Sequence, residues 1–154
     1  MGSPRFWQAF AAVTFLATAA GAETLPGSKW ERFSEISPNG AISYHYDLKS
    51  DYSDAALIVR CWPAEHNIRI FLTIPALKGA RREGFITFNR PEGGISQTKT
   101  MIEAGSVEAS EFFGALVMRD MPGTVFVAVE NERFHIEPLG SATVNADAVK
   151  RCHL

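Results

Sequence analysis

The sequence predicts one α+β domain in which a single twisted antiparallel sheet carries two helices. Three observations support this fold class. Most of the chain alternates apolar and polar residues with the period of two that strands have. Two stretches, 107–118 and 142–153, instead carry apolar residues at helical spacing. The chain has only two cysteines, Cys61 and Cys152, and their pairing would tie the C-terminal helix to a central strand.

The first 22 residues are expected to be a cleaved signal peptide. A short positive segment ending at Arg5 precedes the apolar run 6–20, and Ala20-Gly-Ala22 has the small-x-small form of a cleavage site. A membrane anchor or a buried helix is the alternative, but the run is shorter than the roughly 20 residues that a spanning helix needs. Residues 23–29 are then a loose N-terminal arm, residues 30–154 form the domain, and the location is periplasmic or secreted.

Charge and hydropathy exclude two kinds of partner. The expected mature chain keeps all 17 acidic residues and loses one of 15 basic residues, so it is slightly acidic. That balance gives no electrostatic reason to bind nucleic acid. No polybasic cluster suits an anionic membrane, and no second apolar run is long enough to span one, so no membrane insertion is expected after cleavage.

Two cysteines in an exported chain favour one disulfide. The bond would close a loop of about 90 residues and stabilise the fold by about 4 kcal/mol in the chain-entropy treatment. The alternative is a pair of reactive free thiols, which needs a positive and partly exposed setting. Arg60 adjoins Cys61, but on a strand its side chain points to the opposite face.

The N-terminal half reads as successive strands. Residues 30–36 and 41–48 form a hairpin around the Ser37-Pro-Asn-Gly40 turn. The run 55–62 is apolar on both faces except at Arg60, which predicts an interior strand covered on both sides. Residues 67–74 place four aliphatic side chains inward and Phe71 outward, and short strands are expected at 84–90 and 98–103.

The C-terminal half mixes helices and a hairpin. Ser106 is the expected N-cap of the helix 107–118, and the strands 124–130 and 133–139 form the hairpin that follows. Ser141 is the expected N-cap of the last helix. Its stripe of Val144, Ala148 and Cys152 turns the cysteine toward the sheet.

No catalytic pattern emerges from the sequence. The four histidines (His45, His66, His135 and His153) lack the spacing of a zinc site, and there is no G-x-S-x-G elbow and no phosphate-binding glycine motif. We therefore expect a protein without enzymatic activity, metal or cofactor.

Aromatic and arginine side chains give the better functional indication. Trp62 and Phe71 fall on the less apolar faces of their strands, beside Arg60 and Arg69. Trp, Tyr and Arg are enriched at protein interfaces, so these four residues are the candidate interface. The alternative is that the second helix or the N-terminal arm covers them.

The order of motifs resembles a known family. A Trp-started strand is followed by Leu57-Ile-Val-Arg-Cys61, and Phe134-x-Ile136-x-x-Leu139-Gly140 precedes a helix that ends in Cys152. Over roughly residues 30–152 this is similar to small exported proteins associated with bacterial type VI secretion systems. The resemblance implies a periplasmic, non-enzymatic accessory role.

The functional prediction is an exported accessory or binding protein that acts on an unidentified protein partner and is linked to a secretion system. The alternative is a small secreted inhibitor or host-directed factor without catalytic activity. Both use a disulfide-stabilised domain, so the sequence leaves both open.

Overall fold

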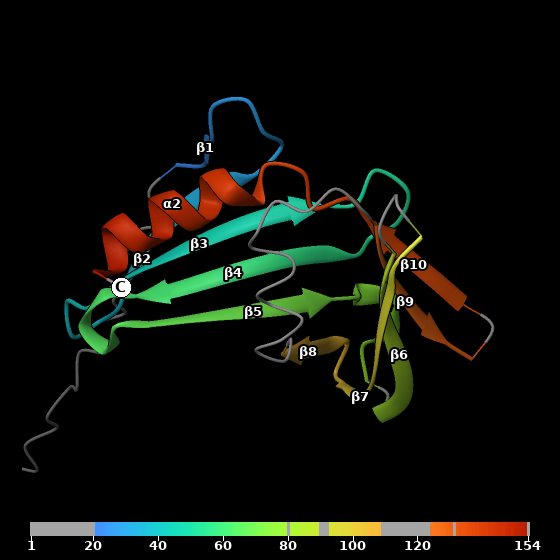
Figure 1. Ribbon diagram of the computed structural model, residues 1–154. Helices are drawn as coiled ribbons and strands as arrows, with labels where there is room; N and C mark the ends of the chain where they lie inside the picture. Colours follow the sequence, from blue (N-terminus) through green and yellow to red (C-terminus); the bar gives the residue numbers. More distant parts are fainter. Residues whose placement is uncertain (1–20, 80, 90–92, 109–123, 131, 154) are drawn as a thin grey trace, which may run out of the picture.

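The computed structural model describes residues 21–79, 81–89, 93–108, 124–130 and 132–153 (Figure 1). The expected signal peptide lies almost wholly outside these residues, as does most of the helix predicted at 107–118. All statements of structure below concern the described residues.

Within the described ranges, ten strands form one antiparallel sheet in the order β1-β2-β3-β4-β5-β8-β7-β6-β9-β10. In chain order the strands are β1 (Glu23–Thr24), β2 (Glu31–Ile36), β3 (Ile42–Lys49), β4 (Ala56–Trp62), β5 (Asn67–Thr73), β6 (Arg81–Asn89), β7 (Ile95–Glu103), β8 (Ser106–Glu108), β9 (Thr124–Val129) and β10 (Glu132–Ile136). Short 3₁₀ turns, η1 (Pro63–Glu65) and η2 (Pro75–Leu77), flank β5, and the helix α2 (Ser141–Cys152) follows β10.

The sheet has two halves that cross steeply. Figure 1 shows β3, β4 and β5 running along the length of α2, whereas β6 and β9 run across them. The short strand β8 joins the halves, because Val107 pairs with Leu72 of β5 and Ser106 pairs with Glu103 of β7. A sheet that twists this far encloses apolar side chains on its concave side.

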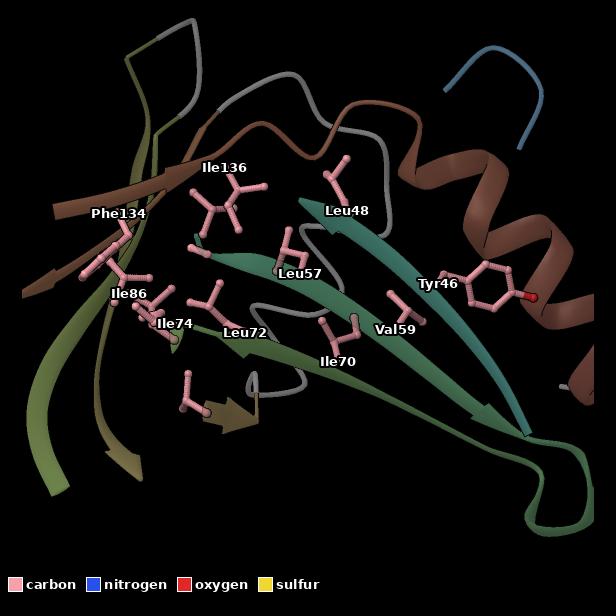
Figure 2. Packing of buried hydrophobic residues seen from close by; sticks show 14 of the residues in the cluster. Tyr46, Leu48, Leu57, Val59, Ile70, Leu72, Ile74, Ile86, Phe134 and Ile136 are labelled. Carbon is pink, nitrogen blue, oxygen red and sulfur yellow. The ribbon is translucent and has the colours of Figure 1, made fainter. Parts of the chain in front are cut away.

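The core fills that concave side and extends beneath α2. Figure 2 shows Ile86, Phe134 and Ile136 of the second half grouped beside Leu72 and Ile74 of the first. The row continues through Leu57, Val59 and Leu48 to Tyr46, whose hydroxyl points toward the helix. Val144, Ala148 and Cys152 of α2 are fully buried against this row. Alternation with period two therefore gives one buried face along β3, β4 and β5 and along β6, β9 and β10.

Close packing in the second half depends on a glycine. A Cβ atom at Gly84 in β6 would lie 2.9 Å from Cγ2 of Val129 and 3.0 Å from the carbonyl oxygen of Ala128. Any larger residue would push β6 and β9 apart, since both contacts are shorter than side-chain packing permits.

Most predicted strands are confirmed, and β6 and β7 are longer than expected. The C-terminal helix and its buried stripe are also confirmed. The described chain contains this one α-helix rather than two. Its N-cap is Gly140, in a left-handed conformation, so the expectation for Ser141 was wrong by one residue.

The expected start of the helix 107–118 was also wrong. Ser106–Glu108 forms strand β8, because pairing with β5 buries Val107, and tertiary pairing overrides local periodicity here. The central strand β4 lies between β3 and β5 as expected. The expectation that both of its faces are covered was wrong. Leu57, Val59 and Cys61 are buried on one face, whereas the residues between them on the other face are half-exposed.

Candidate functional site

The four predicted interface residues lie together on one surface. Cys61 of β4 points to the side that α2 covers, so its neighbours Arg60 and Trp62 point to the opposite side. Arg69 and Phe71 of β5 share that side, since Arg69 pairs directly with Arg60. We call this surface of β2, β3, β4 and β5 the outer face.

Two diagonal stacks connect the four side chains. The Arg60 Cζ atom lies 5.6 Å from the centre of the Phe71 ring, and the Arg69 Cζ atom lies 6.0 Å from that of Trp62. Cations at such distances are attracted to the ring face. Arg60, Trp62 and Phe71 are half-buried and Arg69 is exposed, so the stacks are ordered but still open to a partner.

The charges on the outer face are incompletely compensated. Arg60 and Arg69 are directly opposite, and like charges at such positions repel. Arg69 has a loose ion pair, 3.7 Å from Nε to Oε1 of Glu108. Arg60 forms no ion pair with any described residue, and its buried Nε has no hydrogen-bond partner among them. An anionic group could therefore relieve this pair of guanidinium groups.

Asp47 of β3 attracts Arg60 but forms no ion pair with it. The Asp47 Oδ1 atom is buried and accepts no hydrogen bond from the described residues. Burial raises the pKa of this carboxyl above its ordinary value, while the charges of His45 and Arg60 oppose the rise. The outer face thus holds buried polar atoms on both a donor and an acceptor group.

Ser43, His45 and Glu35 gather at the edge of the same face, but not as a catalytic triad. Ser43 Oγ lies 3.2 Å from His45 Nε2, and Glu35 Oε2 lies 3.5 Å from that same nitrogen. A triad needs the acid on one ring nitrogen and the nucleophile on the other. Burial and the charge of Arg60 lower the pKa of His45, which favours the neutral ring at neutral pH. The three residues form a polar cluster of cross-strand neighbours.

The opposite face of these strands is occupied by α2. A disulfide joins Cys61 to Cys152, with the Cα atoms 6.2 Å apart, and both residues are fully buried. The predicted pairing is therefore confirmed, and the alternative of reactive free thiols was wrong. A structural disulfide is compatible with a location outside the cytoplasm.

A carboxylate fastens the middle of the helix to the same strands. Oδ2 of Asp147 accepts hydrogen bonds from Arg32 Nη1 at 2.8 Å, Tyr46 Oη at 2.9 Å and Arg151 Nε at 2.9 Å. Burial alone would raise the pKa of Asp147, but the donors from Arg32, Arg151 and Tyr46 outweigh it and hold that pKa below its usual value. Burial and the bond to Asp147 raise the pKa of Tyr46. These bonds hold α2 on the side of β2 and β3 that is opposite the outer face.

A second candidate site is a hollow of about 610 Å³ beside the N-terminal arm. Three segments line it: residues 24–29, residues 48–52 at the end of β3 and the start of the connection to β4, and Glu137 with Leu139. Lys29 forms an ion pair with Asp51 at its rim. The sequence did not indicate this hollow, because the three segments lie far apart in the chain and carry no recognisable motif.

The N-terminal arm is not loose where it borders this hollow. Glu23–Thr24 pairs with β2, Leu25 is buried, and Trp30 donates a hydrogen bond from Nε1 to the carbonyl oxygen of Leu139 at 3.0 Å. These contacts fix two walls of the hollow relative to each other.

Neither a metal centre nor a spanning helix is found in the part of the chain that the structure describes. No group of three or more His, Cys, Asp or Glu side chains there could hold a metal ion. No described helix is both long and apolar enough to cross a membrane. Comparison of the chain with models of known families, with curated proteins and with solved structures finds no match.

Proposed function

We propose that this protein is an exported binding protein that holds a protein partner against its outer face. The observation that carries the proposal is the pair of opposed arginines, half-buried Arg60 and exposed Arg69, each stacked on an aromatic ring. Arginine and aromatic side chains are the residues that most often dominate binding energy at protein interfaces.

The chemistry of the face selects the kind of partner. Arg60 lacks a carboxylate partner among the described residues, and Glu108 approaches Arg69 only to 3.7 Å. A carboxylate from another protein could accept hydrogen bonds from both guanidinium groups, and such charge-assisted bonds are short and directional. Apolar side chains beside that carboxylate would pack on Trp62 and Phe71. We therefore infer that the partner presents an acidic side chain flanked by apolar ones.

An accessory role beside a secretion system remains part of this proposal. It depends on the resemblance of the strand around Cys61 and of the closing helix to exported proteins associated with type VI secretion. A periplasmic or secreted location fits the disulfide, which forms and persists in oxidising compartments. A binding role without catalysis fits an outer face on which Ser43, His45 and Glu35 are not arranged as a triad.

The test compares the mature protein with two variants that carry the same charge as each other. The mature protein, the Arg60→Ala/Arg69→Ala variant and the Arg81→Ala/Arg133→Ala variant are immobilised and exposed to periplasmic extract at physiological salt. Arg81 and Arg133 are exposed on β6 and β10, away from the outer face, so the control variant loses the same charge.

We expect the mature protein and the control variant to retain the same partner and the outer-face variant to lose it. Binding should also weaken as salt is raised, because exposed charges are screened. Retention by all three baits, or equal loss from both variants, would contradict a site on the outer face. Thermal unfolding of each variant checks that the fold is kept.

A further inference from the structure

The hollow beside the N-terminal arm has the features of a preformed ligand site. Its volume of about 610 Å³ falls within the range of small-molecule pockets, roughly 300–1,000 Å³. Leu25 and Leu48 are buried in its lining, and Leu139 and Tyr52 contribute exposed apolar surface. An apolar lining with a few polar groups at the rim is typical of such pockets.

Two exposed residues of the lining, Tyr52 and Leu139, each contact a neighbouring part of the fold. Tyr52 is 65% exposed, yet its ring stacks on that of His135 with the ring centres 4.1 Å apart. Leu139 is 58% exposed, and its carbonyl oxygen is fixed by Trp30. Ser50 strengthens the same junction, because its hydroxyl donates to the His135 carbonyl oxygen at 2.6 Å. The stacked Tyr52 ring therefore loses little freedom when a ligand covers it.

The charged groups of the lining divide into a satisfied pair and two unpaired side chains. Lys29 and Asp51 form an ion pair with each other. Lys49 at the end of β3 and Glu137 after β10 are both exposed, and neither forms an ion pair with a described residue. Glu137 is attracted to Lys29 and Lys49 to Asp47, but neither has a close ion pair. The hollow thus presents one ammonium group and one carboxylate that are available for a closer partner, and they come from different segments.

From these features we propose that the hollow binds a short peptide with apolar side chains and two free termini. The α-ammonium group of the peptide pairs with Glu137, and its α-carboxylate pairs with Lys49. The apolar side chains lie between Tyr52 and Leu139. A ligand with a single charge would satisfy only one of the two unpaired groups, whereas this zwitterion matches both. The hollow borders the outer face at Lys49 of β3, but the proposed contacts do not use Arg60 or Arg69 and do not depend on the function proposed for them.

The probe is the tripeptide Leu-Ala-Leu in three forms, titrated into the mature protein by isothermal calorimetry. The first form has both termini free, the second is N-acetylated, and the third carries a C-terminal amide. Each form is also titrated into the Glu137→Gln and Lys49→Met variants. Exposed ion pairs contribute modestly, so we expect each blocked terminus to weaken binding about threefold to fivefold.

The pattern across ligands and variants identifies the contacts. The acetylated peptide should bind Glu137→Gln and the mature protein equally, and the amide should bind Lys49→Met and the mature protein equally, because each contact is already absent. The Tyr52→Ala variant should weaken all three forms, since this exposed ring contacts the apolar part. Glu132→Gln, an exposed carboxylate on β10, is the matched control and should change nothing.

Three results would overturn the proposal. They are no binding of the free peptide, equal binding of all three forms, and losses in the variants that do not depend on which terminus is blocked. The Arg60→Ala/Arg69→Ala variant should bind the peptide like the mature protein. Failure of the outer-face proposal would therefore not affect the peptide test. Failure of the peptide test would likewise not affect the outer-face proposal.

Discussion

Replacement of Asp147 by Asn tests how α2 is fastened to the sheet. The change keeps the shape of the side chain but removes the charge from the atom that accepts three hydrogen bonds, from Arg32, Tyr46 and Arg151. A hydrogen bond to a charged group contributes about 1.5–3 kcal/mol. The three bonds share one oxygen, and the Asp147 side chain is 21% exposed, so they do not add. We expect the free energy of unfolding to fall by about 2–3 kcal/mol.

The pH dependence of that loss distinguishes charge from shape. Because the folded state holds the pKa of Asp147 below its ordinary value, the carboxylate stabilises the fold fully above about pH 4. This contribution is lost as the pH falls through the lower, folded-state pKa. The difference between the mature protein and Asp147→Asn should therefore be constant near neutrality and shrink in acid.

Urea denaturation followed by circular dichroism, at pH 7 and in acid, measures both quantities. Glu103→Gln is the matched control, because it removes an ion pair with Arg81 in which both side chains are exposed. Exposed pairs contribute little, so this variant should unfold like the mature protein. A loss at Asp147 no larger than at Glu103, or a loss that persists unchanged in acid, would refute the role given to the carboxylate.

Three further changes test other parts of the fold. The Cys61→Ala/Cys152→Ala variant should lose up to about 4 kcal/mol of stability, measured by thermal unfolding against the oxidised, disulfide-linked protein, and equal stability would contradict a structural disulfide. Gly84→Ala should cost about 1–3 kcal/mol, and in combination with Val129→Ala the total loss should be smaller than the sum of the two single losses, because the overlapping methyl group is absent. Trp30→Phe should cost about 1 kcal/mol in urea denaturation through the lost bond to the Leu139 carbonyl oxygen, and no change would show that this bond does not hold the arm.

The strands could be predicted because each one buries a single face. Val125, Val127 and Val129 of β9 and Ile70 and Leu72 of β5 alternate in the sequence and are buried together in the structure. The Cys61–Cys152 pairing followed from the number of cysteines and the expected compartment. These features depend on local periodicity or on a simple count.

The errors concern interactions between distant parts of the chain. Val107 begins a stretch whose apolar residues have helical spacing in the sequence, but pairing with Leu72 places Val107 itself in a strand. The order in which β6, β7 and β8 join the sheet is likewise set by register, which the alternation of residues does not encode. The hollow escaped prediction because it forms only where the arm, the connection after β3 and the segment around Glu137 meet.

The outer face was found from the sequence because its residues lie on two consecutive strands. Arg60 and Trp62 are two positions apart on β4, and Arg69 and Phe71 are two apart on β5, so each pair shares a face. The diagonal stacking of each arginine on an aromatic ring could not be predicted. It depends on the register that sets Arg60 opposite Arg69.

Site-specific photo-cross-linking tests the binding role of the outer face most directly. Benzoylphenylalanine replaces Phe71 on the outer face in one protein and Val149, an exposed residue of α2, in another. Each protein is irradiated in periplasmic extract. We expect the probe at 71 to form one prominent protein adduct that disappears in the Arg60→Ala/Arg69→Ala background, and the probe at 149 to form none. An adduct at 149 alone, or one at 71 that survives loss of both arginines, would contradict the proposed function.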